Sequence, residues 1–320
     1  MRLLVTGGSG FIGANFVRDQ LACHPDRAIV NLDALTYAGN PANLADLASD
    51  PRYRFVQGDI RDAALVGQLM EEVDAVVHFA AESHVDRSIT DPGAFVSTNV
   101  MGTFTLLEAA RRAGVDRFVH VSTDEVYGSI PSGAFRETDP LRPSSPYSAS
   151  KAGSDLLALA YHATHGLPVL VTRCSNNYGP YQFPEKLIPL FVTNLLEGRK
   201  VPVYGSGRNV REWIYVLDHC RAVDFVLGCG NPGEVNNIGS GVEKTNLEIT
   251  DALLGLLGKD GSSVEHVGDR KGHDFRYAID CTKLRGLGWA PAFTFEEALA
   301  ATVDWYRANE AWWRPLKEKS

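Results

Sequence analysis

The chain has 320 residues, enough for about two domains of ordinary size and a large hydrophobic core. It carries 31 Lys and Arg against 39 Asp and Glu, a formal net charge of −8 at pH 7. This acidic balance excludes a protein that binds nucleic acid or an anionic membrane by its overall charge, and the hydrophobic fraction of 44% is that of a globular protein.

The cysteines are scattered and include no C-x-x-C pair, which argues against a disulfide framework or a metal site. They are Cys23, Cys174, Cys220, Cys229 and Cys281. No apolar run reaches the roughly 20 residues of a membrane span, and glycines interrupt the first one too early for a signal peptide. We therefore expect a cytoplasmic protein that binds no metal, membrane or nucleic acid.

The first part of the chain alternates short β-branched runs with helix-like stretches, the pattern of βαβ units around a parallel sheet. Strands are predicted over residues 2–6, 28–32, 53–57, 74–79, 117–122 and 168–173. Helices are predicted over residues 13–24, 63–72, 98–113 and 146–165. The expected fold class is therefore α/β.

After residue 173 the pattern changes to clusters of Asn, Pro, Gly and Tyr, which predicts a domain boundary. Short strands are predicted over 200–204 and 211–216, and helices over 216–228, 246–257 and 295–309. We expect residues 1–173 to form the larger domain and residues 174–320 a smaller, mixed α/β domain. Part of 206–236 is expected to return to the larger one.

A glycine-rich turn lies between the first predicted strand and the first predicted helix. Gly7, Gly10 and Gly13 have the spacing G-x-x-G-x-x-G. Glycines allow a tight turn there, and the N-terminus of a helix directs N–H groups at a pyrophosphate. A turn without a ligand is the alternative, but the order of strand, turn and helix favours dinucleotide binding.

Asp33 lies at the end of the second predicted strand, 20 residues after Gly13. A carboxylate at that position accepts hydrogen bonds from both ribose hydroxyls and repels a 2′-phosphate, so NAD is favoured over NADP. Asp59, followed by Ile60, is a weaker candidate for the adenine edge, because Asp at such a position is as often a turn or cap residue.

Tyr147 and Lys151 are four residues apart in the helix predicted over 146–165, and so lie on one face. A nearby ammonium stabilises a phenolate, so we expect the pKa of Tyr147 to be lowered until it can act as a base. One such pair is a weak signal, because both residues are common on helices. Thr123, just after a predicted strand, strengthens it by offering a hydroxyl that could hold a substrate hydroxyl against Tyr147.

With these motifs the chain resembles the extended short-chain dehydrogenase/reductase family over essentially its whole length. The resemblance implies a Rossmann-type doubly wound parallel sheet in an NAD-binding domain over 1–173, and a nucleotide-sugar domain over 174–320. It also implies hydride exchange between a sugar carbon and NAD. Further cofactor contacts that it implies, besides the residues named above, are Phe11, Ile12, Thr36, Phe79, Ala80, Ala81 and Thr98.

Two consecutive carboxylates, Asp124 and Glu125, follow Thr123. Adjacent residues that leave a strand point in different directions, so this pair can address different substrate atoms. A dehydrogenase or a 4-epimerase needs only one base, so two carboxylates suggest additional acid and base steps. The alternative interpretation is that the two residues only cap a helix or lie in a loop and have no chemical role. The run Thr-Asp-Glu-Val-Tyr-Gly, together with residues 32–40, resembles the nucleotide-sugar 4,6-dehydratases within the family.

This closer resemblance implies a lyase that converts a nucleotide-diphospho-glucose, preferably the thymidine form, to the 4-keto-6-deoxy sugar and water. Tyr147, assisted by Lys151 and Thr123, would remove the C4 hydroxyl proton while hydride passes from C4 to NAD. Glu125 would take the C5 proton, Asp124 would protonate the departing C6 hydroxyl, and hydride would return to C6.

Three alternatives remain. A UDP-sugar 4-epimerase or a decarboxylase on the same scaffold would not need the carboxylate pair. A regulatory protein that senses NAD without catalysis would not need Tyr147 and Lys151.

The same resemblance implies the substrate contacts and the oligomer. The diphosphate is expected to bind Arg211, Asn246, Arg270 and His273, since guanidinium groups meet phosphate oxygens bidentately. Taken singly, each Arg is more often a solvated surface charge. Other expected substrate contacts are Ser83, Asn177, Glu185, Lys186, Leu187, Pro202 and Tyr204. Stretches 94–113 and 146–161 match helices that pair between subunits in relatives, so a homodimer is expected.

Overall fold

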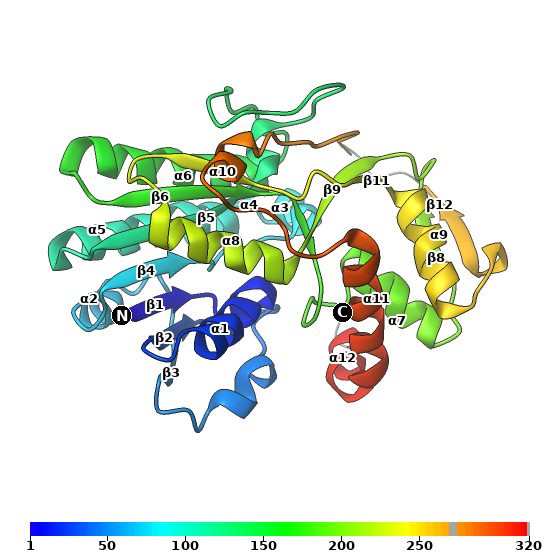
Figure 1. The fold of residues 1–320 in the computed structure, drawn as a ribbon, viewed down its shortest axis with the longest axis horizontal. Helices are drawn as coiled ribbons and strands as arrows, with labels where there is room; N and C mark the ends of the chain where they lie inside the picture. The colour runs from blue at the N-terminus through cyan, green and yellow to red at the C-terminus, as the bar shows by residue number, and fades with distance from the viewer. Residues whose placement is uncertain (269–273, 319–320) are drawn as a thin grey trace.

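The computed structural model describes residues 1–268 and 274–318 and has a parallel sheet with helices on both faces (Figure 1). In the described part of the chain, seven strands form this sheet in the order β10-β6-β5-β4-β1-β2-β3. They are β1 (Arg2–Thr6), β2 (Ala28–Asp33), β3 (Tyr53–Gln57), β4 (Ala75–His78), β5 (Arg117–Thr123), β6 (Val169–Cys174) and β10 (Val235–Ile238). The predicted doubly wound sheet is confirmed.

The strand order reverses at β1, which pairs in parallel with both β2 and β4. In doubly wound sheets, ligands bind outside the carboxyl ends of the strands at this switch point. The segments that follow β1, β2 and β4 are therefore the ones placed for a cofactor.

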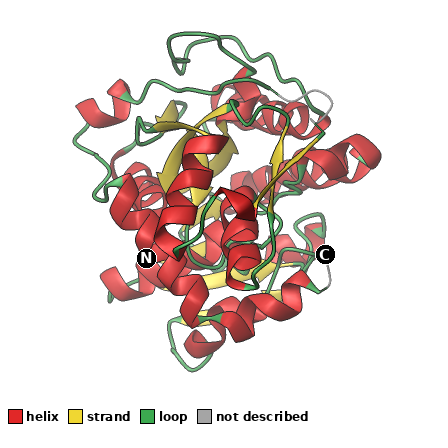
Figure 2. Cartoon of the chain, turned by 90° about the vertical axis from the view of Figure 1, so that its right-hand side faces the viewer, coloured by secondary structure: helices red, strands yellow, loops and turns green. Residues whose placement is uncertain are grey.

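Two helical layers cover the sheet because successive side chains of each strand point to opposite faces. Leu3 and Val5 of β1 pack in a core with α1 (Phe11–Cys23) and α8 (Val216–Cys229). Leu4, between them, packs in a second core with helices on the other face. Those helices are α2 (Ala63–Met70), α5 (Thr103–Ala113) and α6 (Pro146–His165). Figure 2 shows the strands enclosed between helices.

The helix predicted over 98–113 is two elements in the structure. A π-helical stretch, η2 (Val96–Gly102), precedes α5 and continues into it. Further short helices that were not predicted lie in the first half of the chain: η1 (Pro41–Leu47), α3 (Val85–Thr90), α4 (Pro92–Phe95) and η3 (Asp124–Tyr127).

Smaller sheets and a group of helices follow β6. The described residues place β7 (Asn176–Tyr178), β9 (Val210–Tyr215) and β11 (Glu243–Thr245) in one sheet, and β8 (Val201–Tyr204) with β12 (Val264–Val267) in another. Besides α8, the helices described in this part are α7 (Leu187–Leu196), α9 (Asn246–Leu257), η4 (Gly261–Ser263), α10 (Thr282–Gly286), α11 (Phe295–Ala308) and α12 (Glu310–Lys317).

The later part of the chain interleaves with the large sheet. β10 pairs in parallel with β6 at its edge, and α8 packs against α1 (Figure 1). Both elements follow β9, which belongs to a smaller sheet. Helix α7, which was not predicted, contains Pro189 in its first turn, where the missing N–H of proline breaks no helical hydrogen bond.

Candidate active site

A cleft of about 380 Å³ opens at the carboxyl end of the large sheet, within the usual range for a small-molecule site. Its lining includes residues that end or follow five strands of the sheet: Gly7, Asp33, Phe79, Thr123 and Cys174. Every residue expected at the cofactor and every residue expected in catalysis borders this cleft. The structure thus brings together positions spread from Gly7 to Lys151.

Only glycine fits at two positions of the glycine-rich turn, because backbone segments approach each other very closely there. Gly7 has a φ of +72°, and a Cβ there would lie 2.6 Å from the backbone nitrogen of Ala80. A Cβ on Gly13 would lie 2.2 Å from the carbonyl oxygen of Gly7. Gly10, which has no side chain to cover free N–H groups, is the N-cap of α1. These features fit a dinucleotide pyrophosphate at the N-terminus of α1.

Asp33 is held in place by two backbone N–H groups. Its Oδ2 accepts a hydrogen bond from Ser9 at 2.9 Å, and its Oδ1 accepts one from Leu35 at 2.8 Å. Burial raises the pKa of Asp33, and the two N–H donors act against this shift. A carboxylate has further lone pairs, so the oriented side chain can still accept hydrogen bonds from ribose hydroxyls.

Asp59 borders the cleft. It also forms a turn, which was the alternative role considered for it. Its Oδ1 accepts the N–H of Arg61 at 2.8 Å, and the guanidinium of Arg61 binds the same carboxylate. This hydrogen bonding lowers the pKa of Asp59. Arg61 in turn donates to Oγ of Ser97 at 2.8 Å, so Asp59 is fixed at the cleft edge by its neighbours.

Tyr147 and Lys151 lie in the first turns of α6, which begins with a capping box at Ser145 and a proline at Pro146. Both side chains are buried, with 9% and 4% of their surface exposed. Nζ of Lys151 donates a hydrogen bond to the carbonyl oxygen of Val121 at 2.8 Å. The pair therefore lies against the end of β5.

The expected lowering of the Tyr147 pKa is wrong for the protein chain by itself. Burial, and next the charge of Glu125, raise the pKa of Tyr147 well above its usual range, against a hydrogen bond with Thr123. Burial also lowers the pKa of Lys151, whose ammonium is bonded to Val121. Tyr147 is thus a neutral phenol, and a further positive charge in the cleft is needed to favour its phenolate.

Asp124 and Glu125 begin the short helix η3, which Thr123 caps by accepting the N–H of Glu125 at 3.3 Å. Burial, and next the charge of Glu125, raise the pKa of Asp124 well above its usual range. Burial likewise raises the pKa of Glu125, while Lys186 and Arg211 act to lower it. Oδ2 of Asp124 is buried and finds no hydrogen-bond partner among the described residues. The pKa values of both carboxyl groups are therefore raised, that of Asp124 more strongly.

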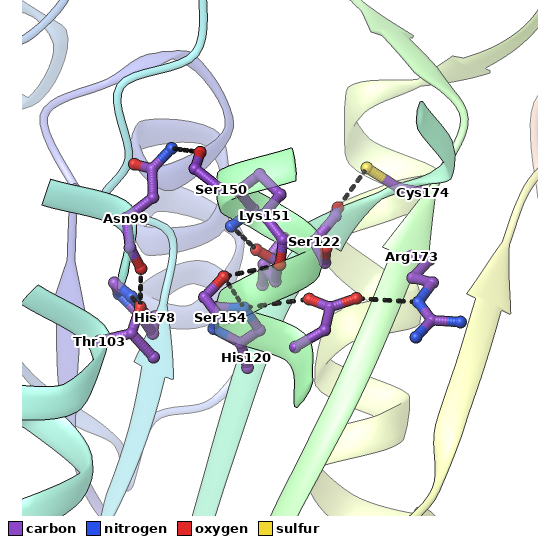
Figure 3. A network of polar contacts seen from close by, with 12 residues as sticks. His78, Asn99, Thr103, His120, Ser122, Ser150, Lys151, Ser154, Arg173 and Cys174 are labelled. Atoms are coloured by element: carbon purple, nitrogen blue, oxygen red, sulfur yellow. Dashed lines mark hydrogen bonds and ion pairs between the residues drawn. The ribbon is translucent and has the colours of Figure 1, made fainter. Parts of the chain in front are cut away.

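A buried polar network behind the cleft holds α6 against the sheet (Figure 3). Oγ of Ser154 donates to the carbonyl oxygen of Lys151 at 2.8 Å, and Nε2 of His120 lies 3.1 Å from that hydroxyl. Asp155 lies 3.2 Å from His120 and accepts Nε of Arg173 at 2.9 Å. These contacts join α6 to β5 and β6 directly beneath the reactive pair.

The expected substrate residues divide into three groups. Those that border the cleft are Ser83, Asn177, Glu185 and Lys186. Those placed outside its lining are Leu187, Pro202, Tyr204, Arg211 and Asn246. Arg270 and His273 lie outside the described residues.

Two of the substrate residues outside the lining have clear structural contacts. Nη2 of Arg211 donates to the carbonyl oxygen of Asp274 at 2.9 Å, and its guanidinium lies 4.6 Å from the centre of the Tyr277 ring. Asn246 is the first residue of α9, and its N–H donates to the carbonyl oxygen of Asn209 at 3.1 Å.

Several residues of the cleft were not predicted from the sequence, and Tyr37 is one of them. Its hydroxyl donates to Oε1 of Glu185 at 3.2 Å, and the Arg87 guanidinium lies 3.6 Å from its ring centre. Glu185 also pairs with His84 at 3.6 Å, so this carboxylate is largely engaged within the protein. No spacing in the sequence signals these contacts, because they join three segments far apart in the chain.

The fold and the cleft together define a class: a Rossmann-fold enzyme of the short-chain dehydrogenase/reductase type, with a Thr, Tyr and Lys set and an adjacent carboxylate pair. A family model described as GDP-mannose 4,6 dehydratase matches residues 4–302. The chain belongs to this family, which confirms the resemblance found in the sequence.

Relatives of known activity agree with this assignment. A dTDP-glucose 4,6-dehydratase of Streptomyces antibioticus is 60% identical over 325 residues, covering 100% of this chain and 96% of that protein. A crystal structure of a dTDP-glucose 4,6-dehydratase from Streptomyces venezuelae with NAD bound is 61% identical, with a TM-score of 0.96 over 99% of this chain and 100% of that chain.

A UDP-glucose 4-epimerase of Thermus thermophilus, solved in complex with NAD, is only 34% identical. Its TM-score is 0.89, over 97% of this chain and 100% of that chain. The fold is thus shared by both enzyme types, whereas sequence identity is much higher to the dehydratases.

Proposed function

We propose that this protein converts dTDP-glucose to dTDP-4-keto-6-deoxyglucose and water, with NAD as a bound cofactor that each turnover regenerates. The observation that carries the proposal is that the buried Asp124 and the partly buried Glu125 lie together beside Tyr147, because dehydration needs an acid and a second base that an epimerase does not. The similarity to the dehydratases supports the same activity.

The cleft offers fitting groups for the pyrophosphate and for one ribose of a dinucleotide. The turn with Gly7, Gly10 and Gly13 would hold the pyrophosphate, and Asp33 would bind the adenosine ribose. When bound, NAD supplies a hydride acceptor and donor together with a positive charge on its nicotinamide ring.

At C4 of the sugar, Tyr147 accepts the hydroxyl proton and Thr123 orients that hydroxyl. Lys151 anchors this end of the site, since its ammonium is bonded to Val121 and its helix is fixed by the buried network. Because burial raises the pKa of Tyr147 in the chain alone, a positive charge in the assembled site would favour its phenolate.

At C5 and C6 the two carboxyl groups act in opposite directions. Glu125 takes the C5 proton, which a ketone at C4 has made acidic, and its raised pKa makes it a stronger base than an exposed Glu. Asp124, kept protonated by burial and by Glu125, donates its proton to the departing C6 hydroxyl. Their different surroundings assign one acid and one base to adjacent residues.

We also infer how the nucleotide sugar is held. Ser83 and Asn177 would bind the sugar from the cleft wall, and Lys186 would bring a positive charge to it. The proposed diphosphate ligands are Arg211, Asn246, Arg270 and His273, and Pro202 with Tyr204 would pack on the base. Support for Arg211 comes from its position, close enough to lower the pKa of Glu125.

The test is a turnover panel of dTDP-, UDP-, CDP- and GDP-glucose, without added NAD and with the products identified by mass. The expected result is loss of one water from dTDP-glucose, at the highest rate of the four. A product of unchanged mass would support the epimerase alternative. No turnover of any of the four sugars would contradict the proposal.

A homodimer is proposed for this chain from an apolar surface over the helices predicted to pair. Large hydrophobic side chains are exposed on α3, η2, α5 and α6, namely Ile89, Val96, Met101, Phe104 and Leu156. Apolar side chains gathered on one set of helices are typical of an interface between subunits. A monomeric mass by sedimentation at micromolar concentration would contradict this proposal.

The cytoplasmic setting also remains a proposal. All five cysteines, each within the described residues, are free, which suits a reducing compartment. Among the described residues, no helix has the length and apolar character needed to cross a bilayer. Cell fractionation tests the location, and recovery outside the cytoplasmic fraction would contradict it.

A further inference from the structure

The C-terminal helix α12 is connected to the glycine-rich turn through one buried asparagine. Nε1 of Trp312 donates to Oδ1 of Asn43 at 2.8 Å, and Nδ2 of Asn43 donates to the carbonyl oxygen of Ser9 at 2.9 Å. The N–H of Ser9 donates to Oδ2 of Asp33, also at 2.9 Å. A continuous chain of hydrogen bonds therefore runs from α12 to the carboxylate at the cofactor cleft.

Asn43 has only one orientation that satisfies its neighbours. The side chain is 1% exposed, so each of its polar atoms must find a partner within the protein. Exchange of its amide oxygen and nitrogen would set a donor against Trp312 and an acceptor against the Ser9 carbonyl. The backbone of Asn43 is also held, because its carbonyl oxygen accepts Nε of Arg18 at 3.0 Å and its N–H donates to Asn40 at 3.0 Å.

The indole of Trp312 is itself held in an aromatic cluster. Its ring centre lies 5.0 Å from that of Trp305 and 5.8 Å from that of Tyr181. Arg18 lies 4.9 Å from the centre of the Tyr181 ring, which ties the cluster to α1. The indole N–H is therefore directed at Asn43 by packing from both the C-terminal helices and the first helix.

We propose that Trp312 is a positioning residue for the cofactor: through Asn43 it holds Ser9, and so Asp33, in the geometry that binds the adenosine ribose. The inference rests on the NAD binding proposed above. It makes retention of NAD depend on the docking of α12, an element that contributes no residue to the cleft lining.

The first test replaces Trp312 with Phe, which keeps an aromatic ring but removes the N–H donor. The holoenzyme is diluted into NAD-free buffer, and release of NAD is followed with time. We expect release about three to ten times faster than from the wild type, the factor that one lost hydrogen bond represents. Equal release rates for Trp312→Phe and the wild type would overturn the proposal.

Trp313→Phe is a matched control on the same helix. Nε1 of Trp313 donates to the carbonyl oxygen of Tyr306 at 2.8 Å, so this variant also loses one indole hydrogen bond, but one that stays among the C-terminal helices. It is expected to lower the melting temperature and leave NAD release unchanged. If both variants released NAD equally fast, the effect of Trp312 would be general destabilisation and the proposal would be wrong.

A double-variant cycle with Asn43→Ala tests the connection itself. If Trp312 acts through Asn43, then Trp312→Phe should add no further acceleration of NAD release in the Asn43→Ala background. Additive effects would show that Trp312 acts by another path and would overturn the proposal. The wild type distinguishes this inference from the proposed function. A wild type that bound no NAD would contradict the proposed function. If the wild type binds NAD and Trp312→Phe releases it at the wild-type rate, only the role of Trp312 is contradicted.

Discussion

The hydroxyl of Thr123 donates a hydrogen bond to Oδ1 of Asp124 at 3.3 Å, while it accepts the N–H of Glu125 at the same distance. One side chain thus fixes both carboxylate residues at the start of η3. The other oxygen of Asp124 is left without a partner among the described residues. The two carboxyl groups are neighbours in the sequence but differ in their surroundings.

Glu125→Gln should block proton removal from C5 while leaving oxidation at C4 possible. The amide keeps the size and shape of the side chain but cannot accept the proton, so dehydration should slow by about 10²- to 10⁴-fold. The measurement is incorporation of solvent deuterium at C5, with reduced cofactor followed by absorbance. Wild-type exchange in the variant would remove Glu125 as the base.

Asp124→Asn should affect the later step and spare the earlier one. An amide is a poor acid, so loss of the C6 hydroxyl should slow by about 10²- to 10⁴-fold while deuterium exchange at C5 continues. Mass analysis of single turnovers should show an accumulated 4-keto sugar that retains its C6 oxygen. Rapid release of the deoxy product would contradict the assignment.

The rate of dehydration should depend on pH in two directions. Asp124 must be protonated and its pKa is raised, so the rate should fall as the pH rises through that pKa. Glu125 must be ionised and its pKa is also raised, so the rate should fall as the pH drops through it. A pH–rate profile of the wild type should therefore be bell-shaped, and Asp124→Asn should lack the alkaline limb. If Asp124→Asn kept the alkaline limb, that limb would have to arise from the titration of another group.

Tyr147→Phe should impair the first step by about 10²- to 10⁴-fold, because the ring that remains has no hydroxyl group to exchange a proton with the C4 hydroxyl. The ring itself packs against Phe95, with centres 6.3 Å apart, so the variant should fold normally. Single-turnover absorbance should show that reduced cofactor no longer accumulates. Wild-type accumulation in a folded variant would contradict the role of Tyr147.

Asp155→Asn should destabilise the fold more than it changes substrate affinity. Asp155 is fully buried between His120 and Arg173, and its loss leaves the Arg173 cation unpaired, at a cost of about 3–5 kcal/mol in the free energy of unfolding. Urea unfolding near neutral pH measures this difference. A loss below about 1 kcal/mol would show that the pair contributes little.

The effect of Asp155 should also depend on pH. Burial acts to raise the pKa of Asp155, but the hydrogen bond with His120 and the charge of Arg173 lower it overall. Its contribution is therefore complete above the unfolded pKa of about 4 and is lost as the pH falls through the lower folded value. The variant and the wild type should converge in stability below that range. A difference that stayed constant into strong acid would argue against ionisation of Asp155.

Local patterns in the sequence were enough to predict the elements that carry most of the cleft. The strand before Gly7 and the helix after it follow from periodicity and glycine spacing, as does the placing of Tyr147 and Lys151 on one helix face. These predictions succeed because hydrogen bonding within a segment and burial of one face act over a few residues. Helix α7 was not predicted, and η2 was predicted as part of one regular helix, since contacts with other parts of the chain decide the form of both.

The sequence by itself predicted the cofactor and catalytic positions that border the cleft, because glycine freedom, strand alternation and helical spacing are properties of short segments. Only the tertiary structure decided their protonation: burial and the charge of Glu125 raise the pKa of Tyr147, against the shift expected from Lys151 alone. It also decided that Trp312 reaches Asn43. Desolvation and contacts between distant segments arise only when the chain has folded, so no local pattern could have encoded either result.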